Sequence, residues 1–115
     1  MEFSIDMPER NGIITTQSGA KFYLFTVLDA IEEFNKKCPK NGGILLRDHI
    51  GHIKEVTHIT KSLRYENQKL VAEIELLNNR LKDVKIKPII EIPLRFESGI
   101  SVERVLSINN IYLEF

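Results

Sequence analysis

KFYLFTVLDAIEEFNKK, residues 21–37, decides the predicted fold, because its apolar side chains recur with the spacing of one helix face. These side chains stand three or four residues apart, at Leu24, Val27, Leu28, Ile31 and Phe34. Charged residues fall between them, so the stretch predicts a single amphipathic helix. Ser18 is the expected N-cap, and Pro39 with Asn41-Gly42-Gly43 marks the end of the helix.

Segments typical of β-strands lie on both sides of this helix. Residues 2–6 alternate apolar and polar side chains and predict a short opening strand, and residues 44–46 predict a brief buried one. Residues 56–65 are rich in β-branched side chains, and residues 70–77 place four apolar side chains on one face. With residues 66–69 between them, these two segments predict a hairpin.

The most regular alternation of apolar and polar residues runs over residues 84–96 and predicts one long strand. Pro88 and Pro93 cannot donate hydrogen bonds to a ladder, so we expect this strand at a sheet edge, or bent or bulged at the prolines. Ile89 interrupts the polar face and is expected to be exposed at that edge. A strand edge of this kind is a place where partners bind.

A closing hairpin is predicted at the end of the sequence. Residues 102–108 and 111–115 flank Asn109-Asn110, and Asn tolerates the positive φ of a two-residue hairpin turn. We therefore expect an α+β fold, with residues 1–115 as a single domain. In it, one amphipathic helix packs on a mostly antiparallel sheet or a small β-barrel.

The composition is that of an ordinary globular protein of 115 residues, with 43% hydrophobic and 28% charged side chains. Sixteen basic residues balance sixteen acidic ones, which disfavours nucleic acid as a partner. No apolar run approaches the roughly 20 residues of a membrane span, so no membrane association is expected. The single cysteine, Cys38, favours a reducing compartment. No glycine-rich phosphate loop, CxxC pair or HExxH occurs, and no cofactor is expected.

Three histidines, His49, His52 and His58, fall within ten residues of one another, close to Asp48 and Glu55. Imidazole and carboxylate groups are ligands of zinc and similar ions. His58 lies in a predicted strand and need not converge with the other two, which belong to a predicted loop. Surface or core histidines held by hydrogen bonds are the favoured interpretation, so no metal site is predicted.

Nucleophilic catalysis would require a Ser or Cys held against an oriented base. Ser98, before Gly99 at the end of the long predicted strand, is the best-placed serine, although Ser-Gly is also ordinary turn chemistry. The reactivity of Cys38 depends on surroundings that the sequence does not reveal.

Several segments together resemble a known family. They are Asn11-Gly12, residues 30–35 (AIEEFN), 43–49 (GILLRDH), 56–60 (VTHIT), 63–67 (LRYEN) and 71–77 (VAEIELL). Their order and hydrophobic pattern resemble the prohead maturation proteases of tailed bacteriophages. The resemblance covers about residues 11–77 and implies the β-barrel serine protease fold shared with herpesvirus assemblins.

By this resemblance, His49 stands where the family keeps its catalytic histidine, and Ser98 lies near the position of its serine. The family's histidine is typically followed by proline, but here by Ile50, and its Ser-Ser-Arg-Gly stretch is here residues 97–100, ESGI. The resemblance is therefore to a reduced, non-catalytic relative.

The favoured function is a non-catalytic bacteriophage virion component, a capsid-associated or head-stabilising protein found in the virion or the host cytoplasm. Its partners would be capsid or other virion subunits, and a homo-oligomer is compatible with this prediction. Ile89, Tyr112 and Phe115 are the predicted partner-binding residues. One alternative is a serine protease of head maturation that uses Ser98 and His49. The other is a regulatory protein that binds a host target.

Overall fold

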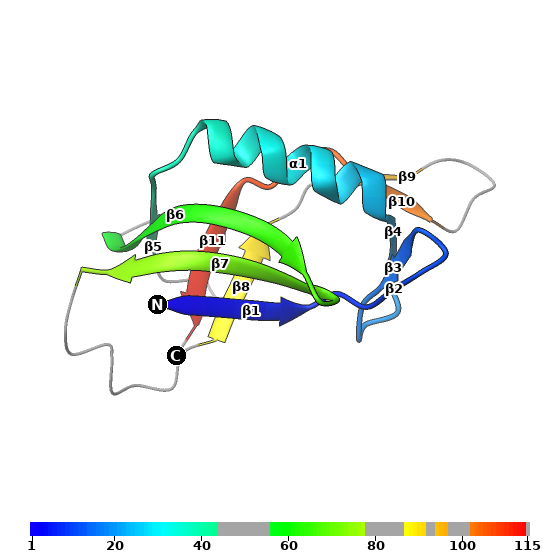
Figure 1. Ribbon diagram of the computed structural model, residues 1–115, viewed down its shortest axis with the longest axis horizontal. Coiled ribbons are helices and arrows are strands. Elements are labelled where there is room, and N and C mark those ends of the chain that lie inside the picture. The colour runs from blue at the N-terminus through cyan, green and yellow to red at the C-terminus, as the bar shows by residue number, and fades with distance from the viewer. Residues whose placement is uncertain (44–55, 78–86, 92–93, 97–101, 115) are drawn as a thin grey trace.

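The computed structural model describes residues 1–43, 56–77, 87–91, 94–96 and 102–114 (Figure 1). These residues form one helix and eleven strands. In chain order they are β1 (Glu2–Asp6), β2 (Glu9–Arg10), β3 (Ile13–Thr15), β4 (Lys21–Tyr23), α1 (Leu24–Lys36), β5 (Lys40–Gly43), β6 (Val56–Glu66), β7 (Lys69–Leu76), β8 (Lys87–Glu91), β9 (Leu94–Phe96), β10 (Glu103–Val105) and β11 (Asn110–Glu114).

The front layer in Figure 1 is an antiparallel sheet with strand order β1-β7-β6-β5. Its centre is the β6–β7 hairpin, and both the hairpin and the opening strand β1 were predicted. The hairpin turns at Asn67 and Gln68, which have positive φ angles of 52° and 65°. Positive φ at both central residues matches the twist of the flanking strands.

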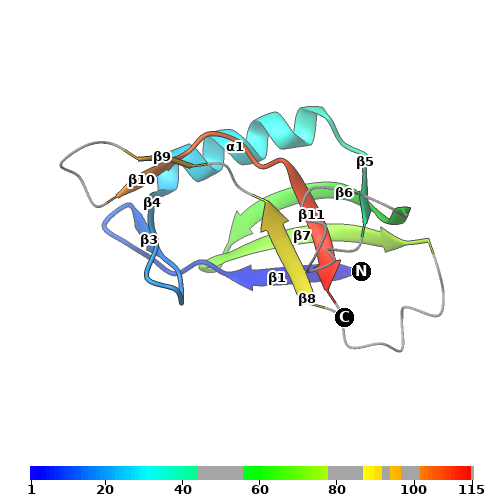
Figure 2. The same cartoon turned by 180° about the vertical axis from the view of Figure 1, so that it is seen from behind.

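Two further sheets complete the fold. β2-β3-β4-β10-β9 lies at the right-hand end in Figure 1, and its β4 and β10 run parallel. β8 and β11 form an antiparallel pair behind the front sheet and run steeply across it, as Figure 2 shows from behind. The fold class is α+β, as predicted, with mostly antiparallel strands. The sheets do not close into a barrel, so the barrel alternative was wrong.

The helix begins three residues later than predicted, because Lys21–Tyr23 are strand β4, paired with β3. Tyr23 occupies the N-cap with an extended backbone and no side-chain cap. The predicted cap, Ser18, instead lies in the loop before β4, where its hydroxyl is 3.0 Å from that of Thr16. Pairing with β3 satisfies the backbone hydrogen-bonding groups of residues 21–23. This pairing explains why the helix does not extend over these residues.

The long strand predicted over residues 84–96 is divided into β8 and β9, which belong to different sheets. Pro93, which lies between them, has no N–H to contribute to a continuous ladder. In the described part of the chain, β8 pairs only with β11 and β9 only with β10, so the prediction of an edge position is confirmed for both.

The prediction of a closing hairpin was also wrong, because β10 pairs with β4 and β9 while β11 pairs with β8. Burial explains why the local hairpin does not form. Ile108, Ile111 and Leu113 are all buried, and the observed strand pairing places these side chains in the core. The strand predicted at residues 44–46 lies outside the described residues.

The core lies between the front sheet, the helix and the β8–β11 pair. Its buried apolar side chains are Met7, Ile14, Phe22, Val27, Ala30, Ile31, Phe34, Leu63, Leu70, Ala72, Ile74, Val105, Ile108 and Ile111. Phe3 and Ile5 of β1 pack against it while remaining half-buried. The helix is anchored to β6 at its last turn, where the Asn35 side chain accepts a hydrogen bond from Leu63 N–H (2.8 Å) and donates one to Leu63 C=O (2.9 Å).

Candidate functional site

The structure separates the residues predicted to bind a partner. Tyr112 is only 5% exposed in β11, so its side chain lies in the interior, and its role in partner binding stays a prediction. Asn110, Ile111 and Leu113 of β11 are buried as well. Ile89 is half-buried in β8, directly across the ladder from Tyr112. Phe115, His49 and Ser98 lie outside the described residues.

His58 is fully buried in β6 and both of its ring nitrogens are occupied. Its Nε2 lies 2.8 Å from the carbonyl oxygen of Ile111, which can only accept, so Nε2 carries the proton. Nδ1 then accepts from the hydroxyl of Thr57, 2.9 Å away. Burial lowers the pKa of His58, against the opposing effect of the bond to Ile111. This histidine is neutral and structural, and it joins the front sheet to β11.

Neither thiol reactivity at Cys38 nor metal binding gains support from the described residues. Burial raises the pKa of the Cys38 thiol, which lowers its thiolate content and its reactivity. No group of three or more His, Cys, Asp or Glu side chains among the described residues could hold a metal ion. The loop histidines and carboxylates considered for zinc, residues 48–55, lie outside those residues.

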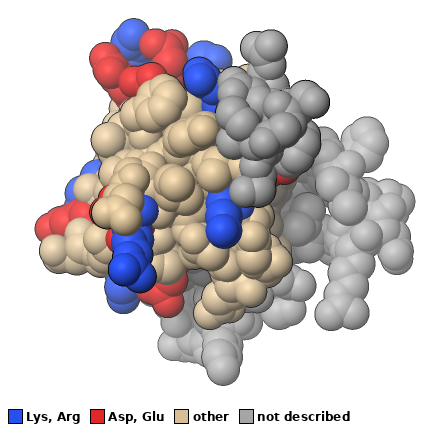
Figure 3. Space-filling model, turned by 90° about the vertical axis from the view of Figure 1, so that its right-hand side faces the viewer, with Lys and Arg blue, Asp and Glu red and all other residues tan. Residues whose placement is uncertain are grey.

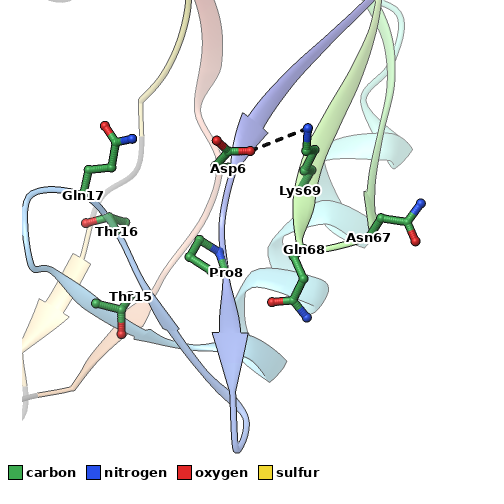
Figure 4. Close-up of a pocket in the computed structure, with 8 residues that line it drawn as sticks. All are labelled: Asp6, Pro8, Thr15, Thr16, Gln17, Asn67, Gln68 and Lys69. Atoms are coloured by element: carbon green, nitrogen blue, oxygen red, sulfur yellow. Dashed lines mark ion pairs between the residues drawn. The ribbon is translucent and has the colours of Figure 1, made fainter.

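A hollow of about 470 Å³ lies between the β6–β7 turn and the loop after β3 (Figure 4). It is lined by Asp6, Pro8, Thr15, Thr16, Gln17, Asn67, Gln68 and Lys69. Its only ionisable groups, Asp6 and Lys69, face each other at 3.7 Å. Figure 4 shows Asn67 turned away from the other lining side chains. The lining thus contains no nucleophile paired with a base.

An exposed aromatic and apolar surface is built where α1, β4 and β10 meet. Thr26, in the first turn of α1, organises this junction: its buried hydroxyl donates to Tyr23 C=O (2.7 Å) and accepts from Val105 N–H (3.1 Å). The parallel pairing of β10 with β4 sets Glu103 opposite Phe22. β10 is thereby fixed against the start of the helix, and Arg104 is brought to Tyr23.

Arg104 lies over two aromatic rings at this junction. Its guanidinium carbon is 5.8 Å from the centre of the Tyr23 ring and 5.6 Å from that of Phe25. The two rings are themselves 5.6 Å apart and tilted by 40°. These distances are those of cation–π contacts and of an aromatic pair, so the three side chains hold one another in place.

Large apolar side chains extend this cluster across the surface. Phe25 is 51% exposed, Leu28, one helical turn further on, is 45% exposed, and Leu106 is 58% exposed. We call Tyr23, Phe25, Leu28, Arg104 and Leu106 the α1–β10 surface.

A hollow of about 330 Å³ lies within the α1–β10 surface. Phe25, Arg104 and Leu106 line it together with Thr26, Asp29, Ala30, Glu33 and Val105. Figure 3 shows the end of the molecule where α1 begins, and much of its described surface is neither acidic nor basic. Exposed apolar side chains gathered beside an arginine are typical of protein-binding surfaces.

One feature of the sequence indicated this surface: Phe25 lies outside the apolar stripe of the helix. Leu28 was assigned to the buried stripe but is exposed, while Thr26 and Ala30 are buried in its place. Arg104 and Leu106 lie far along the chain from the helix, so no local pattern connects them with it.

No protein-family model, curated protein or solved structure matches this chain. The described helix is not long and apolar enough to cross a membrane.

Proposed function

We propose that this chain is a non-catalytic protein that binds another protein through the α1–β10 surface, as a capsid-associated component of a bacteriophage virion. The observation that carries the proposal is the exposure of Phe25 and Leu106 beside Arg104, with the exposed Leu28 one helical turn from Phe25. Aromatic residues and arginine are enriched in interfaces, and contiguous exposed apolar side chains mark binding sites on soluble proteins.

The exposed apolar side chains of this surface supply part of the free energy that a specific contact requires. Complete burial of a large apolar side chain contributes about 1.5–3 kcal/mol. Because Phe25, Leu28 and Leu106 are each about half exposed, covering them supplies about 3 kcal/mol in all. That is roughly a hundredfold in affinity, and polar contacts at the rim, to Arg104 for example, would add to it.

The phage setting rests on the resemblance of residues 11–77 to prohead maturation proteases. The non-catalytic assignment rests on departures from that family, at Ile50 after His49 and at residues 97–100. The occupied, buried imidazole of His58 is consistent with a structural role for this histidine.

The test is to quantify the chain by mass spectrometry in purified particles from its natural source, with and without substitutions. Phe25→Ser combined with Leu106→Ser should reduce the particle-bound fraction at least tenfold. Leu77→Ser is the matched control, because Leu77 is 52% exposed but lies at the end of β7. This control should leave the particle-bound fraction unchanged.

Two results would replace the proposal with an alternative. Absence from particles, together with stable co-purification of one host protein, would select the host-binding regulator. Labelling of Ser98 by a fluorophosphonate probe in the folded chain would select the serine protease.

A further inference from the structure

Thr26 lies beneath the centre of the α1–β10 surface, in the first turn of α1. The residue is only 7% exposed, so a partner gains little from contacting it directly. Its hydroxyl nevertheless makes two hydrogen bonds, donating to Tyr23 C=O (2.7 Å) and accepting from Val105 N–H (3.1 Å). Because Thr26 and Val105 are 79 positions apart in the chain, this one hydroxyl joins two distant segments of the surface.

On the helix side, the hydroxyl fixes the point where β4 passes into α1. Tyr23 is the N-cap residue, its side chain makes no cap bond, and its carbonyl oxygen receives the hydroxyl of Thr26 three residues later. Phe25 stands directly before Thr26 and belongs to the same turn. The aromatic pair of Tyr23 and Phe25 therefore projects from a stretch of backbone that the hydroxyl holds in place.

On the strand side, the hydroxyl holds the inward residue of β10 between two outward ones. Val105 is 5% exposed, whereas its neighbours Arg104 and Leu106 are both exposed. The ladder between β10 and β4 is short, with a single residue pair in register. The bond from Val105 N–H to Thr26 therefore ties β10 to α1 at the place where Arg104 and Leu106 emerge.

Loss of the Thr26 hydroxyl would leave the buried Val105 N–H without its acceptor. A buried donor without an acceptor is unfavourable, so β10 would shift until this N–H reached water or another oxygen. Any such shift moves Arg104 relative to the two rings that it covers at 5.8 Å and 5.6 Å. Cation–π attraction requires this proximity, so the arrangement of the exposed side chains depends on a hydroxyl that lies beneath them.

We propose that Thr26 is the positioning residue of the α1–β10 surface: its hydroxyl sets β10 against the start of the helix and so holds the surface in the arrangement that the protein partner binds. The inference rests on the proposed function and adds how its binding surface is kept ready for a partner. Side chains that are already held in the bound arrangement lose less conformational freedom on association, and this saving raises the affinity.

Thr26→Val tests the proposal, because valine keeps the β-branched shape of threonine but lacks the hydroxyl. Thr26→Ser keeps the hydroxyl and is the rescue variant. We expect Thr26→Val to lower the particle-bound fraction by about fivefold or more, and Thr26→Ser to stay within about twofold of the unsubstituted chain. A particle-bound fraction that Thr26→Val leaves unchanged would overturn the proposal.

Asn35→Ala is the matched control, which separates positioning from stability. Like Thr26, Asn35 donates one hydrogen bond and accepts one, but it does so at the last turn of α1, with Leu63 of β6. We expect Asn35→Ala to lower the urea midpoint and to leave the particle-bound fraction unchanged. If both substitutions lower that fraction equally, the loss reflects general destabilisation and the proposal fails.

NMR reports the position of β10 without any partner. In the unsubstituted chain we expect slow hydrogen exchange at Val105 N–H. We also expect the δ protons of Arg104 to be shifted upfield by the ring currents of Tyr23 and Phe25. Thr26→Val should speed the exchange by about tenfold or more and reduce the upfield shift, whereas Thr26→Ser should preserve both. Rapid exchange at Val105 in the unsubstituted chain would refute the proposal even if Thr26→Val does not fold.

These experiments separate this proposal from the function on which it rests. If Phe25→Ser with Leu106→Ser releases the chain from particles while Thr26→Val does not, the function stands and the inference about Thr26 fails. If neither change releases the chain, both fail.

Discussion

Gly42→Ala is expected to be among the most damaging small substitutions in this protein. A methyl group at Gly42 would lie 2.1 Å from Nε2 of His58 and 2.7 Å from the carbonyl oxygen of Ile111. Both distances are far shorter than any van der Waals contact, so the imidazole must move and its 2.8 Å bond to Ile111 must break. Gly42 is therefore required by close packing between β5, β6 and β11.

The expected decrease in the free energy of unfolding can be estimated from two contributions. Overpacking of a filled interior destabilises by about 1–3 kcal/mol. Leaving a buried polar group without its hydrogen bond costs about 1–3 kcal/mol more. We expect the free energy of unfolding of Gly42→Ala to fall by about 2–6 kcal/mol, which is a large share of the total for a domain of this size.

Urea denaturation followed by circular dichroism measures this change, and Gly19→Ala is the matched control. Gly19 has a φ of 86° and no atom within 4 Å of an added Cβ. The free energy of unfolding that Gly19→Ala loses therefore reflects backbone strain alone, at about 1–2 kcal/mol. In a His58→Ala background, Gly42→Ala should cost at least about 1 kcal/mol less, since the conflict is largely with the imidazole. A Gly42→Ala protein within about 0.5 kcal/mol of the unsubstituted chain would refute the reasoning.

Three further predictions concern the described interior. Because burial lowers the pKa of His58 below its unfolded value of about 6.5, the unfolded chain binds the proton first. Stability should be steady above about pH 7 and fall as the pH drops below that value, by at most about 1.4 kcal/mol per pH unit, and His58→Gln should abolish this slope in urea melts. Asn35→Ala removes both hydrogen bonds to Leu63 and should lower the free energy of unfolding by about 1–3 kcal/mol, with Asn35→Asp in between by the same assay. Thr60→Val should raise the thermal midpoint, because the buried Thr60 hydroxyl has no hydrogen-bond partner among the described residues, and a lower midpoint would contradict this.

Local patterns were sufficient for the elements that short-range physics determines. The spacing of Val27, Ile31 and Phe34 predicted the helix, and all three are buried against the core. The β-branched residues of 56–65 and the alternation in residues 70–77 predicted the β6–β7 hairpin, whose turn has positive φ at Asn67 and Gln68. In each case the residues that decide the structure lie within one turn or one strand of each other.

Long-range pairing determined what the sequence patterns missed. Residues 21–23 continue the apolar pattern of the helix, but β3 recruits them as a strand. The prediction of a closing hairpin relied on the turn propensity of Asn109-Asn110, and pairing of β11 with β8 overrode it. His58 could not be assigned from its neighbours, because its partner at Ile111 is 53 residues away.

The position of His58 explains why binding and stability should be separable in this protein. His58 and Gly42 hold together β5, β6 and β11, whereas the α1–β10 surface belongs to other elements. Substitutions at sites without shared partners add nearly independently, so changes to exposed side chains of the α1–β10 surface should leave the urea midpoint almost unchanged.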